Sequence, residues 1–317
     1  MRRRREIDIE SPARRRGLQA ALVLLAGAGL PSHTVFAAAH AAQRTGEIPA
    51  GGEPIPVMGL GTYRTFDVPL SSTAEMETLR EVTRLFIERG GRMIDSSPMY
   101  GRAEAVTGRL VSALGAGGEV FYATKVWTRG EQAGMAQMNA SFDKMQTDFV
   151  HLMQVHNLTD TATQIRNIRK LQDEGRVRYL GITHYTTGAF DELEAWMKKE
   201  KIDYIQFPYS IASRVAEERL IPAARDLGVA TIAHRNFERG SLFRRVKGRA
   251  LPEWASEFDC GTWGNFFLKY LMAEPGITNL IPATSDPGHL DDNMNAGLGR
   301  LPDEAMRMRM VEYVEGL

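Results

Sequence analysis

The chain has 317 residues, of which 43% are hydrophobic and 25% are charged, so it holds enough apolar material for one large core or two smaller ones. Lysine plus arginine and aspartate plus glutamate both number 39, a balance that creates no overall field to attract nucleic acid or another strongly charged partner. The single cysteine, Cys260, excludes an intrachain disulfide and a metal site built from several cysteines.

The first 45 residues differ from the rest of the chain. Three adjacent arginines at 14–16 precede an apolar stretch at 18–30, which is too short to span a hydrocarbon core of about 30 Å comfortably. The small residues at alternate positions in 37–39 and 39–41 suit a signal peptidase. The arginines resemble a twin-arginine signal, which carries folded proteins across a bacterial inner membrane. We expect residues 1–45 to be an export signal with a short linker, which makes the protein periplasmic and the twin-arginine translocation machinery its partner. A disordered basic leader and an uncleaved anchor are the alternatives.

From residue 55 on, short β-like runs alternate with longer amphipathic stretches, and eight such alternations occur. This alternation predicts a parallel sheet. The predicted strands are, in chain order, residues 57–62, 92–96, 120–125, 149–156, 177–183, 204–209, 229–235 and 279–282. Eight strand-helix units predict a closed barrel, the (β/α)8 TIM barrel of the α/β class, over residues 46–317.

A doubly wound sheet is the alternative fold for this pattern. It needs a G-x-G-x-x-G turn after the first strand, whereas the chain reads GLGTYR over residues 59–64. A longer connection at 238–257 lies where a barrel can insert a loop over its mouth. Both features favour the barrel.

Unusual polar residues collect where the predicted strands end, which is where chemistry takes place in such a barrel. Asp95 ends the second predicted strand, with Tyr100 just beyond it. Lys125 ends the third strand and His156 ends the fourth. Each residue alone has an ordinary interpretation, as an ion pair, a packed ring or a core histidine. Their coincidence in successive units predicts one cluster at the barrel mouth.

The chemistry of this cluster follows from its groups. A nearby ammonium stabilises a phenolate, so Lys125 is expected to lower the pKa of Tyr100 from its ordinary value of about 10. Asp95 would pair with Lys125, while His156 would donate a hydrogen bond to a bound carbonyl oxygen. The set fits carbonyl reduction with Tyr100 as the general acid. Because it contains no hydride donor, a nicotinamide cofactor must supply the hydride.

Five motifs resemble, in order, the landmarks of the aldo-keto reductase family. They are GLGTY at 59–63, IDSSPMYG at 94–101, ATKV at 123–126, LMQVHN at 152–157 and IPATSDPGHLDDN at 281–293. The resemblance covers roughly residues 55–300. It implies a TIM barrel that reduces aldehydes or ketones with NADPH or, less often, NADH. It also implies that Asp95, Tyr100, Lys125 and His156 take the family's catalytic positions.

The resemblance places candidate cofactor contacts at later strand ends. Thr183 and His184 stand where many members have Ser-Asn to hold the nicotinamide carboxamide, and Gln206 matches the glutamine that binds the same group. His234 is in register with a tyrosine that often stacks on the nicotinamide. Arg235 follows it, and two interpretations stay open: it meets a pyrophosphate or the substrate, or it forms a structural ion pair.

The last motif corresponds to the stretch that grips the adenosine end of the cofactor. NADPH users commonly place a lysine or arginine here for the 2′-phosphate, and this motif contains neither. Asp286 would repel a phosphate, and His289 stands nearby. Thr284, Ser285 and the amides that open the next helix can still bind an anion, with Asn293 reaching the adenine. We therefore expect dual use of NADPH and NADH.

Two other functions stay open at this point. A barrel that binds a nicotinamide nucleotide without turnover would serve as a sensor or regulatory subunit, although the four catalytic residues disfavour it. A metal-dependent hydrolase needs several His, Asp or Glu ligands at strand ends, and the first strand ends in Gly61-Thr62 rather than His-x-His. We expect no bound metal. An apolar wall for the substrate is expected among the aromatic residues Trp127, Tyr185, Phe237 and Trp263.

Overall fold

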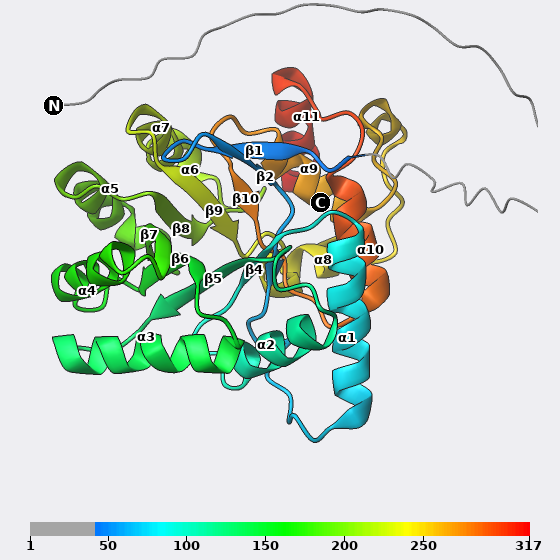
Figure 1. Ribbon diagram of the computed structural model, residues 1–317. Helices are drawn as coiled ribbons and strands as arrows, with labels where there is room; N and C mark the ends of the chain where they lie inside the picture. Colours follow the sequence, from blue (N-terminus) through cyan, green and yellow to red (C-terminus); the bar gives the residue numbers. More distant parts are fainter. Residues whose placement is uncertain (1–41) are drawn as a thin grey trace, which may run out of the picture. The chain divides into compact units, whose positions relative to one another are not determined.

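The strands of the computed structural model, which describes residues 42–317, form a barrel around which the helices are arranged (Figure 1). Eight strands pair in parallel, each with the next along the chain. Their bounds are β3 (Leu60–Gly61), β4 (Met93–Asp95), β5 (Phe121–Val126), β6 (Val150–His156), β7 (Val177–Thr183), β8 (Tyr204–Pro208), β9 (Ala230–His234) and β10 (Asn279–Leu280). The predicted TIM barrel is confirmed. The predicted export signal lies, up to residue 41, outside the described residues.

The first and last barrel strands are much shorter than the sequence predicted. They meet through two isolated bridges, Met58 with Leu280 and Gly61 with Ala283, instead of a continuous ladder. The amide of Leu280 donates to the carbonyl of Val57 at 2.8 Å and closes the barrel. A Cβ atom at Gly61 would lie 2.6 Å from the carbonyl oxygen of Ile281, so the glycine allows the two backbones to approach.

The helices cover the outside of the barrel (Figure 1). Their bounds are α1 (Thr73–Glu88), α2 (Ala103–Ala113), α3 (Glu131–Met145), α4 (Thr161–Asp173), α5 (Phe190–Lys199), α6 (Val215–Glu218), α7 (Leu220–Asp226), α8 (Ser241–Arg245), α9 (Trp263–Met272), α10 (Pro287–Ala296) and α11 (Glu304–Glu315). α1 shows why they pack there: Leu79, Val82 and Phe86 recur at helical spacing and are buried. Within residues 42–317 no helix combines the length and apolar character needed to cross a membrane.

A short antiparallel hairpin, β1 (Thr45–Ile48) with β2 (Glu53–Pro56), was not predicted from the sequence. Its Ile48 and Ile55 belong to the apolar cluster that fills the barrel interior, so the hairpin adds to that core. The segment before it is also bound, because the amide of Arg44 donates to the carbonyl of Gly297 at 3.0 Å. The signal available in the sequence was Gly51-Gly52 between two short runs.

Alternation along the strands separates the interior core from the site. Side chains two positions apart in a strand point to the same side. The interior cluster includes Phe121, Leu152, Tyr204 and Ile232. The polar residues two or four positions further along the same strands are Lys125, Gln154, His156, Gln206 and His234. The same interior face is therefore apolar at one level of the barrel and polar near the C-terminal strand ends.

Candidate active site

A buried ion pair forms the centre of the site. Nζ of Lys125 in β5 lies 2.6 Å from Oδ2 of Asp95, the last residue of β4. The ammonium also donates to the carbonyl oxygen of Ser96 at 2.8 Å. Lys125 is fully buried and Asp95 almost fully. Burial lowers the pKa of the Lys125 ammonium, and the Asp95 carboxylate opposes that shift.

Two glutamines hold the other oxygen of the Asp95 carboxylate. Nε2 of Gln154 donates to Oδ1 at 3.0 Å, and Nε2 of Gln206 donates to the same atom at 3.1 Å. Sequence reasoning did not assign a role to Gln154, although its place two residues before His156 in β6 puts both side chains on the interior face. Gly181 in β7 leaves room for it, because a Cβ there would lie 2.8 Å from Cγ of Gln154. Asp95 is therefore held by one cation and two amides.

Tyr100 lies between β4 and α2 in the chain and packs against Lys125 and His156. The centroid of its ring is 5.0 Å from Nζ of Lys125 and 5.9 Å from the centroid of the His156 ring, which meets it edge-on. The sequence predicted a lowered pKa for Tyr100, and this prediction is wrong. Burial raises the pKa of the Tyr100 phenol well above its ordinary value, and the Asp95 carboxylate adds to the effect. The physical reason is that burial disfavours the charged phenolate, while Asp95 neutralises Lys125 and leaves little net positive charge to offset this.

His156 ends β6 and is almost fully buried. Burial, helped by the nearby charge of Lys125, lowers the pKa of its imidazole to about 2. The ring is therefore neutral at neutral pH. Its Nδ1 lies 3.0 Å from the hydroxyl oxygen of Ser97, a second residue without an assigned role. The sequence signal for Ser97 was its place in IDSSPMYG, two residues after Asp95.

All four residues predicted for catalysis thus converge at one mouth of the barrel. A family model described as "Aldo/keto reductase family" matches residues 57–310. The chain belongs to the aldo/keto reductase family.

Similar proteins of known name or structure extend this finding. Aldo-keto reductase YhdN of Bacillus subtilis (strain 168) is 26% identical over 217 residues, which cover 64% of this chain and 63% of YhdN. The NADH-specific methylglyoxal reductase of Escherichia coli (strain K12) is 25% identical over 241 residues, 65% of this chain and 72% of that protein. A crystal structure of an aldo-keto reductase from Klebsiella pneumoniae in complex with NADPH has a TM-score of 0.70 at 21% identity, and covers 86% of this chain and 95% of that one. The chain thus spans less than two thirds of the length of YhdN, and the structural likeness shows the shared fold.

The candidate carboxamide contacts of this aldo/keto reductase lie next to the ion pair. The hydroxyl of Thr183 at the end of β7 donates to Oε1 of Gln206 at 3.2 Å, while Nε2 of Gln206 is directed to Asp95. His184 follows, and its Nδ1 accepts from the amide of Thr186 at 3.2 Å. The structure therefore joins Thr183, Gln206 and Asp95 in one hydrogen-bonded chain.

Two residues at the end of β9 complete this side of the mouth. Burial lowers the pKa of His234 to about 3, and its Nε2 lies 3.4 Å from the carbonyl oxygen of His184. Arg235 adopts a left-handed φ of 59° and places its guanidinium over the ring of Tyr185, 5.2 Å from the centroid. Among residues 42–317 no carboxylate lies within 4.0 Å of that guanidinium, so the ion-pair interpretation of Arg235 is wrong for the described part of the chain.

The adenosine-side candidates gather around the start of α10. The carboxylate of Asp286 caps this helix by accepting from the amide of His289 at 2.9 Å. The hydroxyl of Thr284 accepts from the amide of Asp286 at 3.0 Å. Ser285 and His289 are exposed, and Asn293 is buried. One of the helix amides that the sequence offered to an anion is thus already bound to Asp286.

The cation and the hydrogen-bonding groups of the predicted cofactor contacts suit a nicotinamide nucleotide. Arg235 presents a half-buried cation that suits a phosphate, and within the described chain its guanidinium forms no hydrogen bond. The buried amide of Asn293 likewise has no hydrogen-bond partner among residues 42–317, so it is free for a heterocyclic base. In the same part of the chain no three His, Cys, Asp or Glu side chains are grouped to hold a metal ion.

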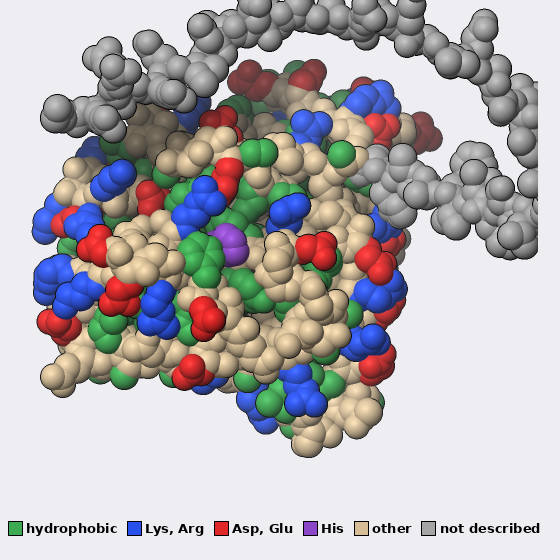
Figure 2. Space-filling view, in the orientation of Figure 1, with side chains coloured by type: hydrophobic (Ala, Val, Ile, Leu, Met, Phe, Trp, Pro, Cys, Tyr) green, Lys and Arg blue, Asp and Glu red, His purple; other side chains and the backbone are tan. Residues whose placement is uncertain are grey.

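The aromatic residues expected to line the mouth divide into two sets. Trp127 and Tyr185 are 44% and 48% exposed, and the ring of Trp127 lies 6.2 Å from that of His156. Phe237 and Trp263 instead pack on Phe267, with ring centroids 6.5 Å and 5.8 Å away. Figure 2 shows a face on which a histidine (purple) lies among hydrophobic side chains (green), with lysines and arginines (blue) around them.

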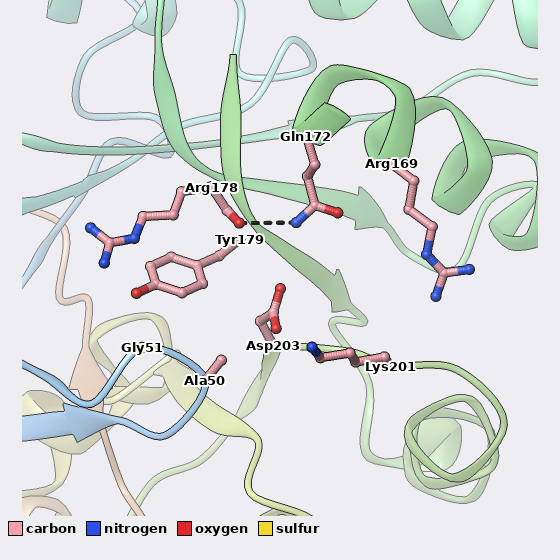
Figure 3. Close-up of a pocket in the computed structure, with 8 residues that line it drawn as sticks. All are labelled: Ala50, Gly51, Arg169, Gln172, Arg178, Tyr179, Lys201 and Asp203. Atoms are coloured by element: carbon pink, nitrogen blue, oxygen red, sulfur yellow. Dashed lines mark hydrogen bonds between the residues drawn. The ribbon is translucent and has the colours of Figure 1, made fainter. Parts of the chain in front are cut away.

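A separate cavity of about 570 Å³ lies away from these residues, near the starts of β7 and β8. Figure 3 shows Asp203 between the side chains that line it and the hydrogen bond from Gln172 to the carbonyl of Arg178. Arg178 pairs with Glu53, and Arg169 pairs with Glu200, both at 2.9 Å. None of the predicted site residues lines this cavity.

Proposed function

We propose that this aldo/keto reductase reduces small aldehydes or ketones to alcohols with a reduced nicotinamide nucleotide. One observation carries the proposal: Tyr100 and His156 lie at the same barrel mouth, beside a buried Lys125–Asp95 pair. A phenol, an imidazole and an ammonium at one point are the groups that carbonyl reduction needs for its oxygen atom.

The chain's own residues handle the oxygen atom and its proton. Tyr100 is a neutral phenol, because burial raises its pKa, so it carries the proton that the carbonyl oxygen receives. The Lys125 ammonium lies 5.0 Å from the ring centroid, and its pairing with Asp95 leaves the phenol neutral until it transfers its proton. His156 is neutral and orients the carbonyl by a hydrogen bond. The bound cofactor supplies the hydride.

The cofactor in this proposal is NADPH or NADH. Thr183, His184, Gln206 and His234 would face the nicotinamide, and Arg235 would meet a phosphate. Thr284, Ser285, His289 and Asn293 would hold the adenosine end. The names of similar proteins support both forms, since the Klebsiella pneumoniae structure is a complex with NADPH and the Escherichia coli relative is called NADH-specific.

A screen of the purified protein against aldehydes, ketones and quinones tests the proposal. The measurement is the loss of absorbance of NADPH or NADH, with the Tyr100→Phe variant as the matched control. Tight nucleotide binding without turnover of any carbonyl would instead favour a catalytically silent barrel that acts as a sensor or regulatory subunit. Strong, reversible inhibition by a chelator would favour a metal-dependent hydrolase.

We also propose that the protein is exported by the twin-arginine machinery and acts in the periplasm. The three arginines at 14–16 before an apolar stretch support this, although they lie outside the described residues. Cleavage near residue 41 would keep the segment that contacts the barrel, because that segment begins after the cleavage point. Within it, Nε2 of Gln43 donates to the carbonyl of Met294 at 3.0 Å. Replacement of all three arginines by lysine should trap the precursor in the cytoplasm. Wild-type protein found only there, with Met1 or Arg2 at its N-terminus, would refute export.

A further inference from the structure

Ser97 is fully buried in the turn after β4, and its side chain lies against the imidazole of His156. Its hydroxyl oxygen is 3.0 Å from Nδ1 of His156. Within residues 42–317 this is the one hydrogen bond that the His156 ring forms, and Nε2 forms none. The ring therefore has one nitrogen engaged by the protein and one left for a ligand at the mouth.

The other engaged histidines each meet a backbone group, which decides where the ring proton lies. Nδ1 of His184 accepts from the amide of Thr186, and Nδ1 of His151 accepts from the amide of Tyr122, both at 3.2 Å. An amide only donates, so each Nδ1 must carry a lone pair. His156 differs, because a hydroxyl both donates and accepts. The position of its proton depends on the other contacts of Ser97.

Those contacts leave one arrangement that satisfies every group. The amide of Met99 donates to the Ser97 hydroxyl oxygen at 3.3 Å, which uses a lone pair of that oxygen. The hydroxyl proton then needs an acceptor, and within the described chain Nδ1 of His156 is the one that Ser97 reaches. If Nδ1 carried a proton, the buried hydroxyl proton would have no acceptor, which is unfavourable. Nδ1 therefore accepts, and the ring proton lies on Nε2.

We infer that Ser97 is a positioning residue that fixes His156 in the tautomer with its proton on Nε2, directed at the carbonyl oxygen of the substrate. The statement that the Nε2 proton is directed at a substrate carbonyl rests on the proposed carbonyl reduction. The tautomer by itself rests only on the contacts of Ser97.

The surroundings of His156 make the tautomer, rather than the charge, the property that Ser97 controls. Lys125 from β5, His234 from β9 and His184 after β7 face the ring, and with burial they keep the pKa of His156 at about 2. The imidazolium is thus absent near neutral pH, and only the two neutral tautomers compete. The rings of Tyr100 and Trp127 are also neighbours of the imidazole, with centroids 5.9 Å and 6.2 Å from its own.

Nitrogen-15 NMR of the full chain with labelled histidine tests the tautomer directly. We expect a His156 signal with the proton on Nε2 and an acceptor-type Nδ1, assigned by its loss in His156→Gln. A wild-type signal with the proton on Nδ1 would overturn the inference. Because this measurement needs no substrate, its result stands even if the wild-type protein reduces no carbonyl and the proposed function fails.

Two variants of Ser97 test the consequence for catalysis. Ser97→Ala should reveal the second tautomer and lower kcat/KM by at least about tenfold, since the wrong tautomer of a catalytic histidine is costly. The Kd for NADPH, measured by fluorescence, should stay the same. Ser97→Thr keeps the hydroxyl and should restore both the spectrum and the rate. An alanine variant that folds with the wild-type spectrum and rate would contradict the inference, and thermal unfolding checks that both variants fold.

Discussion

Lys125 and Asp95 neutralise each other inside the barrel, with 2.6 Å between Nζ and Oδ2. Asp95 ends β4 and Lys125 lies in the neighbouring β5, so the pairing of the two strands brings the groups together. The carboxylate is also held by two glutamine amides, which limits its freedom to move away from the ammonium. As a consequence the ammonium lies close to Tyr100 without ionising it, and the phenol keeps the proton that it is proposed to transfer.

Tyr100→Phe should lower kcat/KM for carbonyl reduction by about a thousandfold, because it removes the proton donor but keeps the ring. The Kd for NADPH, measured by fluorescence, should change little. The assignment of Tyr100 as general acid is wrong if a folded Phe variant keeps most of its rate in single-turnover experiments.

Lys125→Met should abolish carbonyl reduction and lower the free energy of unfolding by about 3–5 kcal/mol, because it leaves the Asp95 carboxylate buried without its cation. Adding Asp95→Asn in the same chain should recover part of the stability but none of the activity. The amide oxygen of the asparagine would still accept from Gln154 and Gln206. Urea unfolding of the single and double variants measures the difference. Equal stability of the Met variant and the wild type would contradict the buried pair.

The wild-type protein should prefer NADPH over NADH by at most about tenfold in kcat/KM, or roughly 1.4 kcal/mol, because Asp286 opposes a 2′-phosphate. Asp286→Arg should raise that preference. The arginine also removes the helix cap of α10, which costs about 1 kcal/mol of stability. Asp286→Asn is the matched control, because it removes the charge and keeps a capping oxygen. A wild-type preference of about a thousandfold or more would rule out this interpretation.

Arg235→Gln should raise the Kd for NADPH about tenfold and weaken its dependence on salt, because the guanidinium is proposed to meet a phosphate. Stability should change little, since no carboxylate among residues 42–317 pairs with it. Arg307→Gln is the contrasting control, because Arg307 pairs with Glu217 at 2.8 Å and Glu274 at 2.6 Å and its loss should destabilise the fold. Unchanged NADPH binding in a folded Arg235→Gln protein would argue for a substrate contact instead.

Stability should fall in mildly acidic solution. Burial lowers the pKa of His151 to about 4, of His234 to about 3 and of His156 to about 2. In the unfolded chain a histidine titrates near pH 6.5, so below that pH the unfolded state takes up protons that the native state does not. The contribution of these three histidines to the free energy of unfolding is therefore fully present above about pH 6.5. It is lost as the pH falls towards their pKa values in the native state.

His151→Phe should reduce the number of protons taken up on unfolding by about one between about pH 6 and pH 5, because burial lowers the pKa of His151 to about 4. His151 stacks on Phe121, and it is not one of the residues predicted for catalysis. Urea unfolding at several pH values measures the slope for the variant and the wild type. An identical slope for both proteins would show that His151 is not neutral in the native state.

The barrel and the place of the four residues predicted for catalysis follow from the sequence alone. Alternating strand and helix signals predict a parallel barrel, and in such a barrel all strands end at one edge. The polar residues that end the second, third and fourth predicted strands must then converge, whatever the details of packing. Asp95, Lys125 and His156 were found for this reason, and Tyr100 was found because it lies just beyond Asp95.

The contacts among these residues were decided only by the tertiary structure. Gln154 and Gln206 meet the same oxygen of Asp95 although 59 and 111 positions separate them from it in the chain. The hydroxyl of Ser97 reaches His156 in the same way. The direction of the Tyr100 pKa shift was mistaken from the sequence, because burial and the pairing of Lys125 with Asp95 outweigh proximity to an ammonium. Strand periodicity is a local property of the chain, whereas desolvation and hydrogen-bond partners depend on which distant segments pack together.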